Sequence, residues 1–211
     1  MWMTCLALEF SSQRRSAAVA RDGVLLGEAW VMGGATTSAP GLILEALGKS
    51  GMRPGDVGRL VVGVGPGSYT GIRRAIATLQ GWHLALGTPL AAVGSMELLA
   101  RIAQERLGRG CDVAVDAQRG EWACGEVEGG QLKTGLRLRT LDELRADIAA
   151  GRCVVTPDEG LPGAVVLHPT AALAAVVGCG LEAQRPEGLA PVYLREAAFV
   201  KAPPQRPIPD P

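Results

Sequence analysis

A glycine-rich stretch contains the residues best suited to hold a ligand: Gly63-Val-Gly-Pro-Gly-Ser-Tyr-Thr-Gly-Ile-Arg73. It follows a predicted buried strand and opens a predicted helix, and Gly65 and Gly67 permit positive φ and close approach of the backbone. Ser68 or Thr70 can cap the helix, whose first N–H groups could bind an anion. A tight strand-to-helix turn without a ligand explains the same residues, and composition alone favours that interpretation.

The histidines and cysteines are too scattered to predict a metal site or a nucleophile. The chain has two histidines, His83 and His168, and neither has the H-x-x-x-H spacing that places two ligands on one helix face. His83 is predicted to be a core residue of its helix, and His168, before Pro169, an exposed loop residue. The five cysteines show no C-x-x-C spacing, and no G-x-S-x-G occurs. We therefore expect no metal and reduced thiols.

Charge and hydropathy disfavour two classes of function. Lys plus Arg and Asp plus Glu both number 21, so the chain lacks the basic excess of a protein that binds nucleic acid unaided. The apolar segment 1–8 is followed directly by the charged Glu9, and it is too short for a signal peptide or a membrane span. No later uncharged apolar run reaches membrane length. We expect a cytoplasmic protein that is not associated with a membrane.

The elements that would position the glycine-rich stretch begin with three strands. An Asp22-Gly23 hairpin signal joins two of them, and apolar residues at helical spacing then alternate with short strands. The expected elements are strands 4–9, 16–20 and 24–29, helix 38–47, strand 59–64, helix 70–86, strand 90–93 and helix 95–107.

A second three-strand start follows residue 108, with a Gly129-Gly130 turn and a Thr140-x-x-Glu143 capping box. The expected elements there are strands 111–116, 121–126 and 131–138, helix 140–149, strands 153–156 and 165–167, and helix 170–177. The repeated order predicts a duplicated ribonuclease-H-like α/β fold, as in actin-like ATPases, with two lobes and a reduced second lobe. We assign 1–108 to the first lobe, 109–202 to the second and 203–211 to a Pro-rich tail.

Gly65–Arg73 resembles the G-P-G-S-[FY]-T-G-[LI]-R signature of the TsaB family, also called YeaZ. Asp116-Ala-Gln-Arg-Gly-Glu121 is similar to that family's D-A-R-R-G-E segment, and Pro191-Val-Tyr-Leu-Arg195 to its C-terminal P-x-Y-L-R. Leu6-Ala-Leu-Glu-Phe-Ser-Ser12 resembles its opening L-A-[IL]-D-T-S-T more loosely. The resemblance therefore covers nearly the whole chain.

The resemblance implies an actin-like fold and a catalytically silent subunit. It implies pairing with a TsaD-like catalytic homologue and a TsaE-like ATPase, in a complex that adds threonylcarbamoyl to the tRNA adenosine next to the anticodon. The chain would then reach tRNA indirectly, form a homodimer when alone, and hold ATP or ADP only within the complex, with no tightly bound cofactor. Two alternatives remain open. The chain could be an independent small actin-like ATPase or kinase, or a stand-alone homodimer that no longer takes part in tRNA modification.

The chain departs from the family at its opening turn. Glu9 stands where the family has Asp, and Phe10 replaces a Thr. In actin-like ATPases that Asp helps to organise the nucleotide-bound metal, so the resemblance implies Glu9, Ser11 and Ser12 as possible nucleotide-facing residues. The charged residues Asp112, Asp116, Arg119 and Glu121 either form a cluster where the lobes meet or belong to a solvated hairpin.

The helix 70–86 has two unlike faces. Its apolar stripe is expected to face the sheet and consists of Ile72, Ala75, Ile76, Leu79, His83 and Leu86. Its opposite side has mostly small residues where a solvent face would have Lys, Glu and Gln, and Gly81 costs a helix interior roughly 1 kcal/mol. We predict a helical interface with another subunit, formed by Leu44, Arg74, Ala77, Thr78, Gly81 and Ala85. Packing of this side on the neighbouring helix 38–48, or on nothing, is the alternative.

Overall fold

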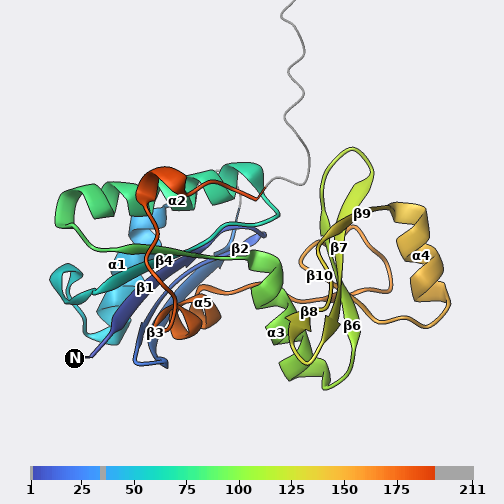
Figure 1. Ribbon diagram of the computed structural model, residues 1–211, viewed down its shortest axis with the longest axis horizontal. Coiled ribbons are helices and arrows are strands. Elements are labelled where there is room, and N and C mark those ends of the chain that lie inside the picture. The colour runs from blue at the N-terminus through green and yellow to red at the C-terminus, as the bar shows by residue number, and fades with distance from the viewer. Residues whose placement is uncertain (1, 34–36, 193–211) are drawn as a thin grey trace, which may run out of the picture.

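The computed structural model describes residues 2–33 and 37–192, which form two lobes, each built on its own β-sheet (Figure 1). The first lobe has a five-stranded sheet in the order β3-β2-β1-β4-β5. The first three strands form an antiparallel meander, and β4 and β5 run parallel to β1. The strands are β1 (Thr4–Glu9), β2 (Arg14–Arg21), β3 (Val24–Met32), β4 (Arg59–Gly63) and β5 (Leu90–Val93).

The Asp22-Gly23 hairpin is confirmed, because both residues have positive φ, 48° and 80°, as a two-residue primed turn requires. Helices α1 (Ala39–Ser50) and α2 (Tyr69–Leu86) cover one face of the first sheet. Ser38 caps α1 by accepting from the Gly41 amide. A short 3₁₀ turn, η1 (Pro54–Asp56), leads into β4.

The apolar stripe of α2 is confirmed only over its first half. Ile72, Ile76 and Leu79 are buried, but His83 is half-buried and Leu86 is 55% exposed. An 18-residue helix is about 27 Å long, whereas the five-residue β4 spans about 17 Å. The last turn of α2 therefore extends past the sheet that its first turns cover.

The second lobe has a six-stranded sheet in the order β11-β10-β6-β7-β8, with β9 paired to β7. Its strands are β6 (Cys111–Asp116), β7 (Glu121–Glu128), β8 (Gln131–Leu132), β9 (Arg137–Thr140), β10 (Val154–Thr156) and β11 (Val165–Val166). The expected strand 131–138 is thus two strands, because β8 and β9 pair with opposite ends of β7 and the chain must bend between them.

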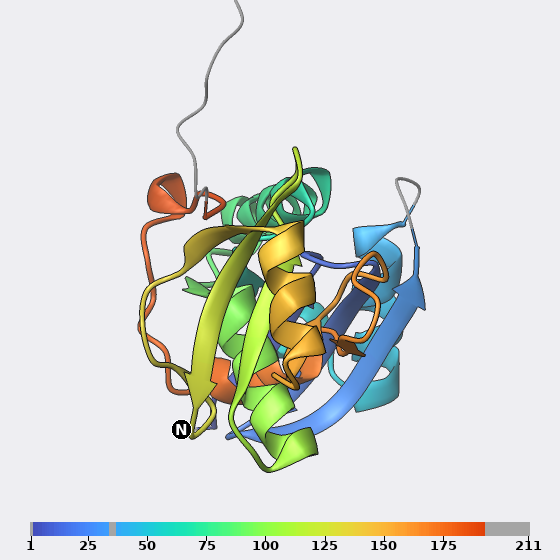
Figure 2. The same cartoon turned by 90° about the vertical axis from the view of Figure 1, so that its right-hand side faces the viewer.

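The helices of the second lobe are α3 (Ser95–Leu107) and α4 (Leu141–Ala149). The predicted capping box at α4 is confirmed, since Thr140 N lies 2.7 Å from Glu143 Oε2 and Glu143 N lies 3.3 Å from Thr140 Oγ1. Figure 2, viewed from the second lobe, shows α4 in front of the strands. None of the described helices is long and apolar enough to cross a membrane.

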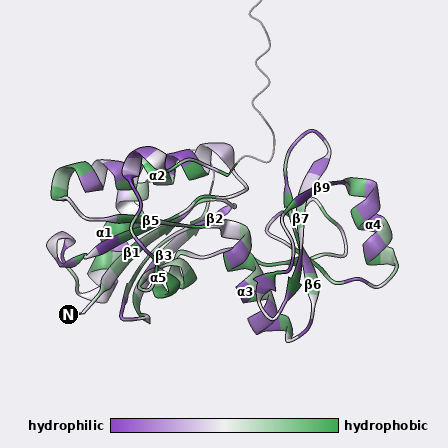
Figure 3. Cartoon of the chain, viewed as in Figure 1, coloured by the Kyte–Doolittle hydropathy of each residue, from purple (hydrophilic) through white to green (hydrophobic). Residues whose placement is uncertain are grey.

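The structure places both ends of the second lobe at other residues than the predicted 109–202. Helix α3 shares a core with the second sheet, to which Met96, Leu99 and Val113 belong. Helix α5 (Ala171–Gly178) returns to the first lobe and packs on the face of the sheet opposite α1 and α2, where Ala174 meets Ala7 of β1. In Figure 3, α5 is hydrophobic over most of its surface, as its burial requires. The second lobe is therefore residues 95–169.

After α5 the chain runs along the first lobe through the 3₁₀ turn η2 (Pro186–Gly188). Gln184 N donates to Leu90 O over 2.7 Å, and Val192 N donates to Val64 O over 2.8 Å. Residues 193–202 of the predicted second lobe, the tail 203–211 and the end of the P-x-Y-L-R motif lie outside the described residues.

Candidate functional site

The glycine-rich stretch packs directly on the turn between β1 and β2. Ser68 N donates to Ser11 O over 2.7 Å, and a Cβ atom added to Gly67 would overlap that same carbonyl. Gly67 also has a φ of +147°, which side chains rarely adopt. A Cβ atom on Gly71, in the first turn of α2, would overlap Phe10 O. The glycines of the motif are therefore needed to bring two backbone segments into contact, whatever else the loop does.

Glu9 holds this packing together from beneath. Its carboxylate accepts from Ser11 N at 2.7 Å and from Ser95 Oγ at 2.8 Å, and Ser95 Oγ in turn accepts from Gly65 N at 3.0 Å. Glu9 is completely buried, and burial raises its pKa, while the hydrogen bonds from Ser11 and Ser95 lower it in part. The structure thus differs from the expectation that Glu9 faces a nucleotide. The carboxylate lies under the turn, with no room for a Cβ atom on Gly63 beside it.

We predict that Glu9→Gln changes the pH dependence of stability. Because the pKa of Glu9 is raised by folding, its contribution to stability is greatest below the pKa of the unfolded chain and is lost as pH rises through the folded pKa. The melting temperature of Glu9→Gln relative to the wild type should therefore increase between about pH 4 and pH 8. Glu105→Gln, on the exposed side of α3, should show no such trend. A constant difference for Glu9→Gln across this range would contradict the assignment.

A cleft of about 390 Å³ lies between the two lobes, and the turn between β1 and β2 forms part of its first-lobe wall. Ser11 and Ser12 line it, together with Gly67–Thr70 of the motif, whereas Gly65, Pro66, Gly71 and Arg73 do not. Arg73 instead lies over the ring of Tyr69, 4.3 Å from its centre. The remaining lining residues are Gln13, Arg15, Gly33, Val115, Asp116, Gln118 and Asp158.

The second lobe contributes two carboxylates to the cleft. Asp116 ends β6 and Asp158 follows β10, and because these strands are parallel neighbours their carboxyl ends meet. Asp116 N donates to Asp158 Oδ2 over 2.8 Å. Burial raises the pKa of Asp158, the hydrogen bond from Asp116 N lowers it, and the charge of Asp116 raises it further. The cleft therefore sets hydroxyl groups of one lobe opposite carboxylates of the other.

Of the four charged residues that were expected either to cluster where the lobes meet or to lie in a solvated hairpin, only Asp116 lines the cleft. Asp112 lies near the opposite end of β6, where its carboxylate accepts from Arg152 Nη2 at 2.7 Å. Asp116 lies four positions further along the strand, about 13 Å away. Arg119 and Glu121 do not line the cleft.

Among the lining residues that sequence reasoning missed, two are charged, Arg15 and Asp158. A signal existed for Asp158, since it closely follows the predicted strand 153–156, much as Asp116 ends the predicted strand 111–116. For Arg15 the signal was a charged residue at the start of the small, apolar strand Ser16–Ala20.

The histidines lie away from the cleft. His83 Nδ1 is 2.9 Å from Thr88 O. His168, predicted to be exposed, is half-buried, and its Nδ1 is enclosed without a hydrogen-bond partner. Burial lowers the pKa of His168, as does the nearby charge of Arg14. Within residues 2–33 and 37–192, no three His, Cys, Asp or Glu side chains are placed to hold a metal together.

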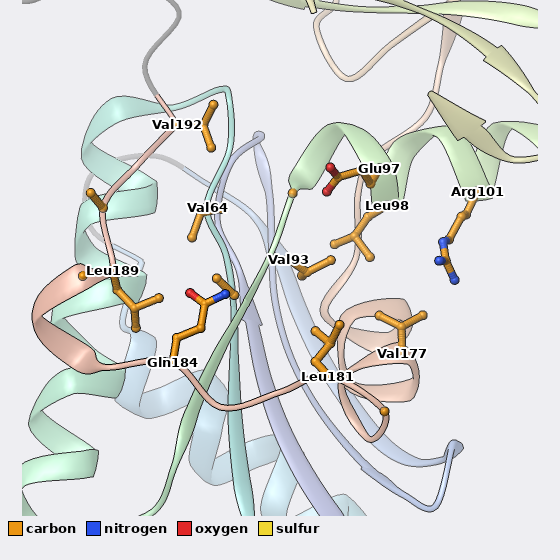
Figure 4. A pocket seen from close by; sticks show the side chains of 15 residues that line it. Val64, Val93, Glu97, Leu98, Arg101, Val177, Leu181, Gln184, Leu189 and Val192 are labelled. Carbon is orange, nitrogen blue, oxygen red and sulfur yellow. The ribbon is translucent and has the colours of Figure 1, made fainter. Parts of the chain in front are cut away.

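A second, larger cavity of about 720 Å³ lies where α3, α5 and the segment 180–192 meet (Figure 4). Figure 4 shows Arg101 of α3 near the apolar side chain of Val177, and Glu97 farther along the cavity next to Leu98. Its lining is mainly aliphatic and includes none of the residues Gly65–Arg73. The interlobe cleft, which the motif does line, is therefore the better candidate site.

Two sheets of this topology, joined by helices and facing each other across a cleft, define a two-lobed protein of the actin-like class. The model of the family described as "TsaD: tRNA N6-adenosine threonylcarbamoyltransferase" matches residues 36–182. The chain belongs to this family, on its TsaB (YeaZ) branch.

Individual relatives support the same placement. The chain is 31% identical over 100 residues to the tRNA threonylcarbamoyladenosine biosynthesis protein TsaB of Bacillus subtilis (strain 168), a match that covers 46% of this chain and 44% of that protein. An uncharacterized protein of Mycobacterium tuberculosis (strain ATCC 25618 / H37Rv) is 34% identical over 101 residues, 46% of this chain and 47% of its own length. The matches thus span less than half the length of these relatives.

The structure of YeaZ from Pseudomonas aeruginosa superimposes with a TM-score of 0.72 at 27% identity, covering 91% of this chain and all of that one. The likeness in structure therefore extends over both lobes, beyond the segments matched in the curated relatives.

Proposed function

We propose that the chain is a non-catalytic subunit that binds and supports a TsaD-like catalytic homologue in threonylcarbamoyl modification of the tRNA adenosine next to the anticodon. The observation that carries this proposal is the likeness to YeaZ over the whole of that chain, combined with the absence of an H-x-x-x-H pair from the sequence. In this proposal a TsaE-like ATPase joins the complex, the chain reaches tRNA only through its partners, and it acts in the cytoplasm.

The outer face of α2 supports a role in association. Of the predicted interface residues, Ala77, Gly81 and Ala85 are exposed in one row, and Leu44 of α1 is 66% exposed. Leu84, which sequence reasoning left out, is 84% exposed and lies two helical turns from Ala77 on the same side. An apolar, small-residue helix face without lysines or glutamates is suited to close packing of another helix. The assignment to an interface stays a prediction.

Two further interface candidates are held in place by the first lobe itself. Arg74 Nη1 donates to Thr37 O over 3.1 Å, and Thr78 Oγ1 donates to Arg74 O over 2.8 Å. Both side chains are half-buried. The first lobe therefore presents this helix face in a fixed form, which lowers the entropic cost of association.

The proposal is tested by coexpressing the chain with the TsaD-like protein of its own organism. We expect the two to elute as one complex in size exclusion with light scattering. Threonylcarbamoyladenosine should form on tRNA in vitro only when the chain and the TsaD-like protein are both present with the other components. Modification at the full rate without the chain would overturn the proposal.

A calorimetric titration of the isolated chain with ATP and Mg²⁺ separates the proposal from an independent ATPase. We expect no tight, magnesium-dependent binding, because Glu9 lies beneath the turn that would have to organise the metal. ATP or ADP would be held only in the assembled complex, and a homodimer of the free chain is compatible with this outcome. Tight binding by the isolated chain would support the ATPase or kinase alternative.

A further inference from the structure

Arg15 is a buried cation at the edge of the interlobe cleft. It lies near the start of β2, on the face of the sheet that also carries Ala17 and Val19 beneath α1 and α2. Only 6% of the residue is exposed, and its guanidinium carbon lies 5.7 Å from the centre of the Phe10 ring. Arg15 also lines the cleft.

The charge of Arg15 has no acidic partner among the described residues. Its Nε and Nη1 atoms are enclosed and make no hydrogen bond, and no carboxylate of the described chain forms an ion pair with it. The neighbouring Arg14 differs, since its Nη2 lies 3.3 Å from Glu28 Oε1 and its guanidinium stacks on Trp30. A guanidinium stays protonated in proteins, so Arg15 cannot escape the cost of burial by losing its proton.

The surroundings of Arg15 add positive potential. Burial lowers the pKa of Arg15, and the charge of Arg74 lowers it further. The N-terminal end of the 18-residue α2 borders the same cleft at Ser68–Thr70, and the dipole of a helix makes this end positive. Ser11 and Ser12 border the same wall, but their hydroxyl groups already bond within the chain, Ser12 Oγ to Arg14 O over 3.2 Å and Ser11 to the Glu9 carboxylate. Buried charges in proteins are ordinarily paired, so an anion is the partner that suits Arg15.

We propose that the first-lobe wall of the cleft binds one compact oxyanion, an inorganic phosphate or the phosphate of a monoester, through the charge of Arg15 and the start of α2. A phosphate group has acceptor oxygens both for the guanidinium and for the amides at the start of the helix. Asp116 and Asp158 form the opposite wall of the same cleft, and their carboxylates repel further negative charge. The site therefore favours a single phosphate group over the polyphosphate chain of ATP. It does not depend on the proposed partner.

The experiment titrates the full chain with inorganic phosphate, AMP and ATP at constant ionic strength, followed by calorimetry and by ³¹P NMR. We expect phosphate and AMP to bind saturably. ATP should bind no more tightly than phosphate does. Arg15→Gln should weaken phosphate binding tenfold or more, and Arg15→Lys should weaken it less because it keeps the charge. Arg106→Gln, a matched substitution on the exposed side of α3, should bind like the wild type.

Asp158→Asn provides a second measurement that does not require Arg15 variants to fold. Removing its charge from the facing wall should strengthen phosphate binding severalfold. Failure of the wild type to bind phosphate saturably overturns the proposal, as does unchanged affinity in a folded Arg15→Gln or in Asp158→Asn. ATP binding tenfold tighter than phosphate would instead identify a nucleotide site. Each of these outcomes is independent of complex formation, so it leaves the proposed function to be judged on its own.

Discussion

Gly67→Val should unfold the first lobe or lower its melting temperature severely. Gly67 has a φ of +147°, and a β-branched residue held there is strained by on the order of 1–3 kcal/mol. Its Cβ atom would also overlap Ser11 O, a backbone atom that cannot rotate away. Relief of that overlap would displace the β1–β2 turn and break the 2.7 Å hydrogen bond from Ser68 N to Ser11 O. Thermal unfolding followed by circular dichroism measures the effect.

Gly81→Ala is the matched control within the glycines of the first lobe. A Cβ atom at Gly81 would have nothing within 4 Å, and the residue lies in the interior of α2. The variant should therefore gain roughly 1 kcal/mol of helix stability. If Gly67→Val kept the wild-type melting temperature and lost only partner or ligand binding, the loop would be a recognition element and not a packing element.

Ala85→Arg should abolish association with the cognate TsaD-like protein, and with a second copy of the chain if a homodimer forms in its absence. Ala85 is exposed near the end of α2, so the arginine is accommodated in the free chain. Across a packed helix interface the same side chain would separate the two backbones and bring a charge into an apolar contact. Gly81→Arg, one turn earlier, is the second probe and should act in the same way. Size exclusion and calorimetry measure association, and circular dichroism checks the fold.

Ala146→Arg, at an exposed position in the middle of α4, is the control for adding a charged residue to a helix surface. It should bind the partner like the wild type, because α4 lies in the second lobe, away from α2 (Figure 1). If Ala85→Arg and Gly81→Arg both associate with wild-type affinity, the outer face of α2 is not the interface. The proposed function would then need a different docking surface.

The sequence by itself determined the features whose causes are local. The Asp22-Gly23 hairpin, the cap at Ser38 and the capping box at Thr140 and Glu143 all depend on residues within a few positions of one another. The glycine motif was predicted as a strand-to-helix turn for the same reason, since positive φ and helix capping are properties of the segment itself. The order of strands and helices, and with it the actin-like fold, could be read from such local signals.

Only the tertiary structure decided which sheet each apolar helix face covers. The periodicity of α3 and α5 shows that each buries a face, but it contains no information on the partner, and both helices belong to the lobe opposite to the one predicted. Glu9 and Arg15 illustrate the same limit at the level of single residues. The sequence shows two charged side chains near one turn, whereas packing directs the carboxylate beneath the turn toward Ser95 and places the guanidinium at the cleft. The contact between Glu9 and Ser95 joins residues 86 positions apart, and the cleft beside Arg15 exists only because the two lobes pack together.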